Sequence, residues 1–523
     1  MSSIPGKSVP FILICIFLPV ILTAQAIQRL TADRFTHYAY DDWISYAPAL
    51  NITSVDMDDN YIYFATAQGG ILRYDKYQNV WDYPFTTSNG LRSNRIRQVV
   101  YSAEDLMLYA ATAAGIDFYK PAERYWSPAE QNKMPPRISP SAVELEGMDQ
   151  DKNYRFPPYY RPGNSALPNF FTEIYLTYQP GGTLYDRYNR DFKLTDRIVD
   201  SWQRLWIGSN GMGPLKADLY NLNLESWPQS LPFITPRDIF LRADQVWIGG
   251  LNNGTGIAGI TLWNISDNSW QYFEAQYINA LYKDDVVAID GDKTHIVFAT
   301  IDGVVIYTPN KNKWLTLNSQ AGLEGDRVND VLVIGDTVYV ASEFGFNWIN
   351  LNSPRVHESS QTTLDHVRIS QLTYKDSLIW AATRSGLFSI DINQDIIKNQ
   401  PTQAAMIDYN LTAIEAVADE IWMAGQGGIA YWNQRQDEWH SFTNLDLQFM
   451  VRDIAATDNC IWFATDKGLL KYDHRRDYWR MFTEKDGLIS QDTYHLDPQD
   501  EYLWIATSKG ITRFRWWSEE RID

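Results

Sequence analysis

Six arginines and one asparagine recur near the start of one strand-like segment of a repeat, and together they could bind an anion. The set is Arg95, Arg97, Arg237, Arg327, Asn329, Arg368 and Arg452. Guanidinium groups offer several N–H donors in a planar fork, which suits carboxylate, sulfate or phosphate oxygens. In a chain with a net charge of −19, such a cluster would attract an anionic ligand. The competing interpretation is that these arginines pair with Asp238, Asp330 and Asp453, which lie beside them in the pattern x-R/N-D-[IV].

A second group of candidate binding residues lies in a long insertion, residues 127–195. It contains Tyr154, Arg155, Tyr159, Tyr160 and Arg161. The first half of the insertion is rich in proline, and the second half alternates like a hairpin about Pro180-Gly181-Gly182. Long excursions from a regular scaffold often carry function. A lid, a partner-docking arm and a blade extension are the three alternatives, and all stay open.

Motifs for catalysis, metal binding or nucleotide binding are missing from the sequence. There is no H-E-x-x-H, no G-x-S-x-G and no G-x-x-x-x-G-K-[ST]. The 7 histidines have no paired ligand spacing, and among 64 acidic residues no pair is singled out by its spacing. The stretch from Asp56 to Asn60 imitates a calcium loop, but Tyr61 replaces its glycine, so we expect a turn between strands. We expect no catalytic residue, no metal and no cofactor.

The element that must position the candidate residues is a repeat of about 42 residues. Its second strand-like segment reads aromatic or apolar, bulky, small, often Thr, then two polar residues and Gly. The ten copies of this segment start at Tyr63, Tyr109, Trp206, Trp247, Val297, Tyr339, Trp380, Trp422, Trp462 and Trp504. Each repeat divides into four strands, A to D. A period of this size built from strands predicts an all-β propeller, in which each repeat forms one blade.

Three residue types within the repeat have a packing role. The small position is Ala or Gly in all ten copies, as at Ala299 and Gly249, which close face-to-face packing of sheets requires. The Thr hydroxyl can bond the backbone of the next turn, and the Gly supplies a positive φ there. Strand D carries a tryptophan that we interpret as a wedge between blades rather than as a sugar-binding residue. These tryptophans are Trp81, Trp126, Trp270, Trp314, Trp439 and Trp479.

The two ends of the repeat array predict closure of a ring. The last copy supplies only strands A to C, whereas an unpaired D-like segment, residues 42–46, precedes the first strand A. Pairing of that N-terminal segment with the C-terminal blade would leave no free edge at the join. We therefore expect one ring of about ten four-stranded blades. The alternative is a seven- or eight-bladed ring plus extra repeats.

The first 26 residues resemble a secretory signal peptide. Lys7 supplies the positive end, an apolar run follows, and Ala24-Gln25-Ala26 forms a small-x-small cleavage site. We expect a mature chain of residues 27–523 that is exported to the periplasm, the cell surface or the medium. No later segment is apolar enough to span a bilayer, and the net charge of −19 argues against nucleic acid as a partner.

The repeat W-I/F-A-T-x-x-G-L-x-x-Y-D, followed by Trp and a link such as Asn89-Gly90-Leu91 or Asp486-Gly487-Leu488, resembles the two-component-regulator propeller repeat. The resemblance covers most of residues 40–517 outside the insertion. It implies a propeller of the kind that forms the periplasmic sensing half of hybrid histidine kinases, here without a kinase region. Similar propellers also occur in cell-surface proteins and in accessory proteins of secretion.

Three functions follow as hypotheses. The first is a non-enzymatic exported propeller that binds an anionic or carbohydrate ligand, or a protein, at its loop face, as a sensor or a scaffold. The second is an enzyme that acts on a polysaccharide or a peptide at the channel mouth. The third is an accessory subunit of an outer-membrane or secretion complex, with the insertion as its docking arm.

Overall fold

The computed structural model describes residues 27–29, 38–129, 133–136, 167–172, 176–179, 182–254, 256–400, 410–442 and 449–518. The predicted signal peptide, residues 1–26, lies outside this part of the chain. β-Strands dominate the regular structure of the described residues, together with single 3-10 turns: η2 (Thr87–Asn89), η3 (Ala275–Tyr277), η4 (Pro309–Lys311), η5 (Ser319–Ala321) and η6 (Thr362–Leu364). Among the described residues there is no helix of the length and apolarity that crossing a bilayer requires.

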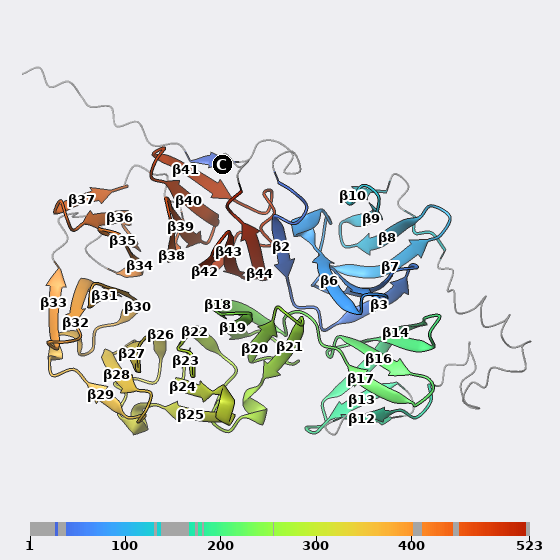
Figure 1. Ribbon diagram of the computed structural model, residues 1–523, viewed down its shortest axis with the longest axis horizontal. Coiled ribbons are helices and arrows are strands. Elements are labelled where there is room, and N and C mark those ends of the chain that lie inside the picture. The colour runs from blue at the N-terminus through green and yellow to red at the C-terminus, as the bar shows by residue number, and fades with distance from the viewer. Residues whose placement is uncertain are drawn as a thin grey trace, which may run out of the picture.

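The strands form ten sheets, which we number as blades 1 to 10 in chain order (Figure 1). Blade 1 contains β3 (Ile52–Met57), β4 (Tyr61–Thr66), β5 (Ile71–Asp75) and β6 (Val80–Phe85). Blade 2 contains β7 (Ile96–Ser102), β8 (Met107–Thr112), β9 (Gly115–Lys120) and β10 (Tyr125–Pro128). Blade 3 contains β14 (Asp191–Val199), β15 (Arg204–Ser209), β16 (Pro214–Asp218) and β17 (Asn223–Ser226), extended by β11 (Phe171–Thr172), β12 (Leu176–Gln179) and β13 (Thr183–Asp186).

Blades 4 to 7 follow the same antiparallel order. Blade 4 contains β18 (Ile234–Arg242), β19 (Gln245–Asn252), β20 (Ile260–Asn264) and β21 (Ser269–Phe273). Blade 5 contains β22 (Val286–Gly291), β23 (Ile296–Thr300), β24 (Gly303–Thr308) and β25 (Lys313–Leu317). Blade 6 contains β26 (Val328–Ile334), β27 (Thr337–Ser342), β28 (Phe346–Asn350) and β29 (Val356–Glu358), and blade 7 contains β30 (Ile369–Lys375), β31 (Leu378–Thr383), β32 (Gly386–Asp391) and β33 (Ile396–Gln400).

The last three blades complete the series. Blade 8 contains β34 (Leu411–Val417), β35 (Glu420–Gly425), β36 (Gly428–Asn433) and β37 (Glu438–Ser441). Blade 9 contains β38 (Val451–Thr457), β39 (Cys460–Thr465), β40 (Gly468–Asp473) and β41 (Tyr478–Phe482), and the short β1 (Gln28–Arg29) pairs with β41 in parallel. Blade 10 contains β42 (Thr493–Gln499), β43 (Tyr502–Thr507) and β44 (Gly510–Arg515), and its fourth strand is β2 (Trp43–Tyr46).

The ten blades divide into a closed ring of seven and an open array of three. The innermost strands of blades 4 to 10 pack in the order β18, β22, β26, β30, β34, β38 and β42, and β42 packs against β18. Outside this ring β3 lies between β7 and β14, so the array runs blade 3, blade 1, blade 2 (Figure 1). The expected single ring of ten blades is therefore wrong, and the alternative of a smaller ring plus extra repeats describes the chain. Blade 4 occupies the face of blade 10 that a larger ring would have offered to blade 1.

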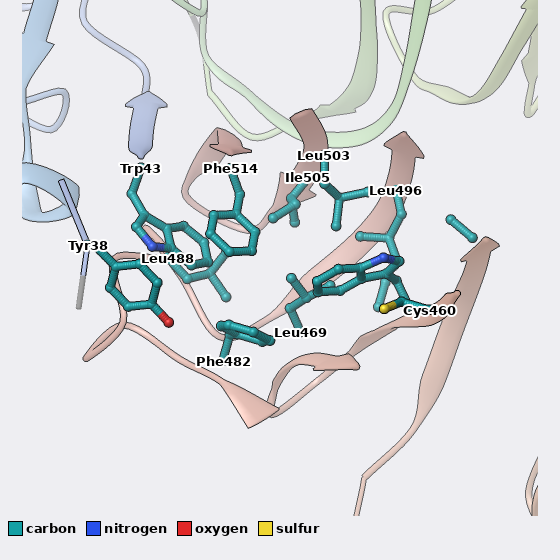
Figure 2. Close-up of a cluster of buried hydrophobic side chains, with 13 residues drawn as sticks. Tyr38, Trp43, Cys460, Leu469, Phe482, Leu488, Leu496, Leu503, Ile505 and Phe514 are labelled. Atoms are coloured by element: carbon teal, nitrogen blue, oxygen red, sulfur yellow. The ribbon is translucent and has the colours of Figure 1, made fainter. Parts of the chain in front are cut away.

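Closure of blade 10 by the N-terminal segment is confirmed. β2 pairs antiparallel with β44, from Trp43 opposite Phe514 to Tyr46 opposite Ile511. The rings of Trp43 and Phe514 stack with centroids 3.8 Å apart, inside a buried cluster that also contains Phe482 (Figure 2). Gly487, at φ 129°, lies against the Trp43 ring, where an added Cβ would come within 2.5 Å of it. A side chain at this position would therefore push the closing strand away.

The repeat residues take the packing roles expected for them. In all six copies with Thr, its hydroxyl donates to the carbonyl of the closing Gly, as from Thr465 to Gly468 at 2.7 Å. Every strand-D tryptophan contacts an aromatic side chain of strand C, as Trp479 contacts Tyr472 with centroids 4.6 Å apart. Each of these six tryptophans also belongs to, or packs against, a hydrophobic cluster shared with a neighbouring blade, which is the wedge position expected for them.

The described half of the insertion extends blade 3. β12 pairs with β13, and β13 pairs with the start of β14. Leu184 and Phe192 pack with Leu205 and Ile207 of β15, and these two residues lie on the opposite face of the blade from Trp206, which packs against blade 1. The hairpin thus covers the face of blade 3 that is turned away from the array. Among the three alternatives, these residues have the geometry of a blade extension.

Polar contacts join the array to the ring on two sides. Ser45 of β2 shares hydrogen bonds with Ser88 of blade 1 at 2.6 Å and with Thr512 of blade 10 at 2.7 Å. On the other side, Arg190 next to the insertion hairpin forms a two-point ion pair with Glu274 of the ring, at 2.8 and 3.1 Å. Both members of this pair are largely buried, so it holds blade 3 in a defined position against blade 4.

Candidate functional site

Each innermost strand contains a β-bulge, and the residue after it, here called the post-bulge residue, lies at the blade-to-blade contact. The register of the strand pairs shifts once per blade, as between Val451 and Asp453 of β38. In the ring the post-bulge residues are Asp238, Ala288, Asp330, Gln371, Ala413, Asp453 and His495. In the array they are Asp196, Ser54 and Gln98. Bulges re-aim side chains, and here they direct polar groups to the next blade.

The acidic post-bulge residues accept hydrogen bonds from the backbone of the next innermost strand. Asp238 accepts from the Ile289 N–H at 2.6 Å, Asp330 from Leu372 at 2.7 Å, and Asp453 from Leu496 at 2.8 Å. Gln371 uses its amide oxygen in the same way, toward the Ile414 N–H at 2.9 Å. An innermost strand has one edge without a ladder partner, so its N–H groups need such acceptors. These side chains therefore join the blades.

The residue before the post-bulge position supplies the complementary donor. Asn329 donates to the carbonyl of Ile369, and Thr412 donates to the carbonyl of Val451, both at 2.8 Å. Arg452 donates to the carbonyl of Thr493, also at 2.8 Å. Two of the predicted ligand-binding residues, Asn329 and Arg452, therefore bind the backbone of the next blade.

A histidine is held between two of these carboxylates. His495 lies 2.9 Å from Asp238 through Nε2 and 3.0 Å from Asp453 through Nδ1. Burial opposes its charged form, but the two carboxylates outweigh burial and raise the pKa of His495 well above its usual value. An imidazolium at this point compensates two buried negative charges, which stabilises the contacts of blade 10 with blades 4 and 9.

Other carboxyls around the ring axis hold protons more strongly than usual. Burial raises the pKa of Asp290 to about 7, of Glu415 to about 8 and of Asp497 to about 6. Burial also raises the pKa of Asp330 well above its usual value. Neighbouring carboxylates add to the effect, since Asp453 acts on Glu415. Near neutral pH the axis is therefore less negative than its composition indicates.

The mouth of the ring carries an Arg–Tyr–Arg arrangement. The Arg237 guanidinium lies 3.7 Å from the centroid of the Tyr494 ring, and the Arg452 guanidinium lies 4.3 Å from it. Arg452 also pairs with Asp492 at 2.5 Å. Burial lowers the pKa of Arg237, and its Nε has no hydrogen-bond partner among the described residues. Arg237 thus keeps an Nε–H donor that is unpaired in the described part of the chain and is itself buried beside the Tyr494 ring.

The structure does not bring the seven predicted mouth residues together. Arg237, Asn329 and Arg452 precede post-bulge residues of the ring, whereas Arg327 and Arg368 converge on Glu343, at 3.9 and 3.5 Å. Arg95 and Arg97 belong to the array. Arg95 lines a cleft of about 650 Å³ between array and ring, which also contains Lys509. Arg97 lines a cavity of about 620 Å³ at the inner edge of the array.

The remaining predictions concern the insertion residues, the turn near Tyr61 and metal binding. Tyr154, Arg155, Tyr159, Tyr160 and Arg161 lie outside the described residues. The turn expected near Tyr61 is present, because Asp58 accepts hydrogen bonds from the N–H groups of Asn60 and Tyr61. In the part of the chain that the structure describes, no group of three His, Cys, Asp or Glu side chains is placed to hold a metal ion.

The chain matches no family model and no curated protein, but it is similar to solved structures. One is PorZ, an essential surface component of the type-IX secretion system of Porphyromonas gingivalis, with a TM-score of 0.58 and 11% identity over 91% of this chain and 87% of that one. Extracellular domains assigned to two hybrid two-component systems of B. thetaiotaomicron match with TM-scores of 0.46 and 0.45. Their identities are 12% over 90% of this chain and 71% of that one, and 14% over 89% and 68%. The propeller fold that the repeat implied is confirmed.

The ring of buried carboxylates is the main feature that sequence reasoning missed. The pattern x-R/N-D-[IV] is visible in the sequence, but by itself it suggests an ion pair between the acidic residue and the arginine beside it. An acidic residue that recurs inside an otherwise apolar strand is expensive to bury unless it accepts hydrogen bonds. The cost of burying these acidic residues was therefore the sequence signal that they accept hydrogen bonds in the folded protein.

Proposed function

We propose that this protein is an exported, non-catalytic β-propeller scaffold that binds a partner at its loop faces as an accessory component of a cell-surface secretion apparatus. The observation that carries the proposal is the similarity to PorZ, which extends over 91% of this chain and so includes both the ring and the array. The repeat's resemblance to propellers of exported proteins and the signal-like first 26 residues support the compartment.

The geometry of the ring supports a binding role over a catalytic one. Its carboxylates are engaged by backbone N–H groups of neighbouring blades, as Asp453 is by Leu496, and so serve to hold the blades together. Arg237 at the mouth keeps an Nε–H that is unpaired among the described residues, and it lies next to Tyr494. A guanidinium beside an aromatic ring suits a carboxylate or another small anion of a partner.

Co-purification from the native cells tests the proposal. The full chain with a C-terminal tag is captured after mild cross-linking, together with a variant in which Tyr154, Arg155, Tyr159, Tyr160 and Arg161 are replaced by serine. Deletion of residues 127–195 is unsuitable, because Leu184 and Phe192 belong to the core of blade 3. We expect envelope proteins of a secretion apparatus with the parent chain, and fewer of them with the variant.

A matched control replaces an equal number of exposed residues in the ring, including Tyr282 and Tyr374. Recovery of the chain from the cytoplasm, or capture of the same proteins by an unrelated exported propeller, would contradict the proposal. Unchanged capture by the serine variant alone would remove the insertion from the binding surface and leave the scaffold role intact.

A further inference from the structure

Blade 2 ends the array with its blade-to-blade contacts unused. In the order blade 3, blade 1, blade 2, each innermost strand forms hydrogen bonds with the next: the post-bulge residue Asp196 accepts from the Val55 N–H at 2.8 Å, and Thr53, which precedes the post-bulge residue of blade 1, donates to the Ile96 carbonyl at 2.8 Å. Blade 2 has the corresponding residues, Arg97 and Gln98, on β7. Among the described residues no blade follows it, and none forms a hydrogen bond with either of these two side chains.

Elsewhere in the molecule the same two residue types show what they bind. Arg452, which precedes a post-bulge residue as Arg97 does, donates to the backbone carbonyl of the following strand. Gln371, a post-bulge residue like Gln98, accepts from a backbone N–H of the following strand. Arg97 and Gln98 are therefore the donor and the acceptor that an extended backbone beside β7 would require.

Blade 2 also has a position for a third contact, which would be made by an aliphatic side chain. In other blades the small position of the repeat receives an aliphatic side chain from the next innermost strand: a Cβ added at Gly208 or Gly249 would lie 2.5 Å from Ile52 or Val286, respectively. On blade 2 the small position is Ala111. It lines the cavity of about 620 Å³ together with Arg97, Gln98 and Ile116, so an aliphatic side chain has a place to enter.

The spacing of the three contacts defines the occupant. In the contact between blades 6 and 7, the carbonyl bound by Asn329 belongs to Ile369, and the N–H bound by Asp330 belongs to Leu372. Both residues are buried and aliphatic, and they lie three positions apart in the strand. An occupant of the blade 2 site would thus have the pattern aliphatic-x-x-aliphatic in an extended conformation.

We propose that the open end of the array is a peptide-binding site that takes an extended aliphatic-x-x-aliphatic segment of a partner protein. The segment continues the blade-to-blade interface, with its first aliphatic side chain over Ala111, its carbonyl bound by Arg97 and a later N–H bound by Gln98. Met134 forms one wall of the cavity, and its unbranched side chain can adapt to different occupants. The inference rests on the proposed scaffold role only in requiring a partner.

The chain itself provides a probe. A fluorescent peptide with the sequence VRISQLTYK, residues 367–375, contains Ile369 and Leu372 at the required spacing. Its binding to the full chain from residue 27 is measured by fluorescence anisotropy. We expect saturable binding that weakens about tenfold when Gln98→Ala or Arg97→Ala removes one hydrogen bond. The matched control Arg95→Ala, an exposed arginine outside the cavity, should bind the peptide as the parent does.

Two changes to the probe and the site sharpen the test. N-methylation at the Leu372 position removes the N–H meant for Gln98, so it should weaken binding to the parent and have little further effect on Gln98→Ala. Ala111→Leu should fill the side-chain position and abolish binding. Absence of saturable binding, or equal affinity for the parent and for Gln98→Ala and Arg97→Ala, would overturn the proposal.

A further peptide covering residues 133–166 identifies the source of the occupant. If it competes with the probe as the stronger ligand, the site belongs to the chain's own insertion, and the assignment to a partner is wrong. Envelope proteins could still be captured by the full chain in that case, so failure of this inference and failure of the scaffold role are distinguishable.

Discussion

The ring and the array are built from the same repeat, yet they satisfy its polar groups differently. Each innermost strand of the ring lies between two others, so acids such as Asp238 and Asp453 find backbone N–H groups on the next blade. The array has two ends. At one end the insertion hairpin covers blade 3 through Leu184 and Phe192, and at the other Arg97 and Gln98 face a cavity. Closure of a propeller thus completes a hydrogen-bond network as well as a hydrophobic core.

The largest difference is expected from substitutions at the small position of the repeat. Ala299 of blade 5 is fully buried against blade 6, so Ala299→Leu should lower the free energy of unfolding by about 3 kcal/mol through overpacking. Ala111→Leu on the open blade 2 should cost less than about 0.5 kcal/mol. Urea denaturation of both variants measures this contrast. Equal losses would show that blade 2 is packed on both faces, as the ring blades are.

Removal of the central histidine should be nearly as costly. His495→Ala leaves the Asp238 and Asp453 carboxylates buried without their cation, which should destabilise the ring by about 2 to 3 kcal/mol near neutral pH. The array lacks an equivalent histidine among its post-bulge residues, so its cavity should still bind the peptide probe in native buffer. His357→Ala, at an exposed histidine of blade 6, is the control. A stability of His495→Ala equal to that of the parent would show that the carboxylates need no counter-charge.

The pH dependence of stability should come mainly from the ring. The pKa of Glu415 is raised to about 8, chiefly by burial, so the folded state binds its proton more tightly than the unfolded state does. Its contribution to stability is present at pH 4 and is lost as the pH rises through about 8. His495, with a raised pKa, changes in the same direction. Glu415→Gln should therefore reduce the loss of stability between pH 5 and 9 by about 2 kcal/mol.

Thermal unfolding of parent and Glu415→Gln across that pH range tests the assignment. The control is Glu438→Gln, an exposed glutamate on the outer strand of the same blade. If the parent became more stable as the pH rises from 5 to 9, the axial carboxyls would have normal pKa values in the folded protein.

The smallest expected effect concerns the ring mouth. Arg237→Ala should weaken the binding of a dicarboxylate such as succinate about tenfold, because one charge-assisted hydrogen bond is lost. Arg97→Ala in the array should leave succinate binding unchanged, which separates anion binding at the ring from peptide binding at the array. Calorimetric titration of both variants is the measurement. Failure of succinate to bind the parent would remove Arg237 from consideration as an anion site.

The sequence predicted the blades well because local patterns determine them. The Ala or Gly at the small position, the Thr before the closing Gly and the strand-D Trp each have a role within one repeat or between neighbours, and each was interpreted correctly. The pairing of β2 with β44 was also predictable. The N-terminal segment is like a strand D without a blade, and the last repeat is a blade without a strand D.

These patterns could not predict that the ten blades divide into a closed ring of seven blades and an open array of three. The contact between β42 and β18 depends on which of two similar blade faces meets blade 10, and both faces carry the same repeat residues. For the same reason Arg95 and Arg97 were grouped with Arg237 and Arg452, which have the same position in the repeat but lie in a different part of the molecule. Repeat position determines the local environment of a residue, whereas ring closure determines its neighbours.

The pairing of β2 with β44 also bears on the order in which the protein folds. β2 leaves the ribosome hundreds of residues before β44, so blade 10 and with it the ring cannot be completed until β44 has been synthesised. Blades 1 to 3 need no strand from the C-terminal blades and can stack earlier. A nascent chain would thus have a folded array and an open ring. The last strand to complete blade 10 would be β2, which was synthesised hundreds of residues earlier.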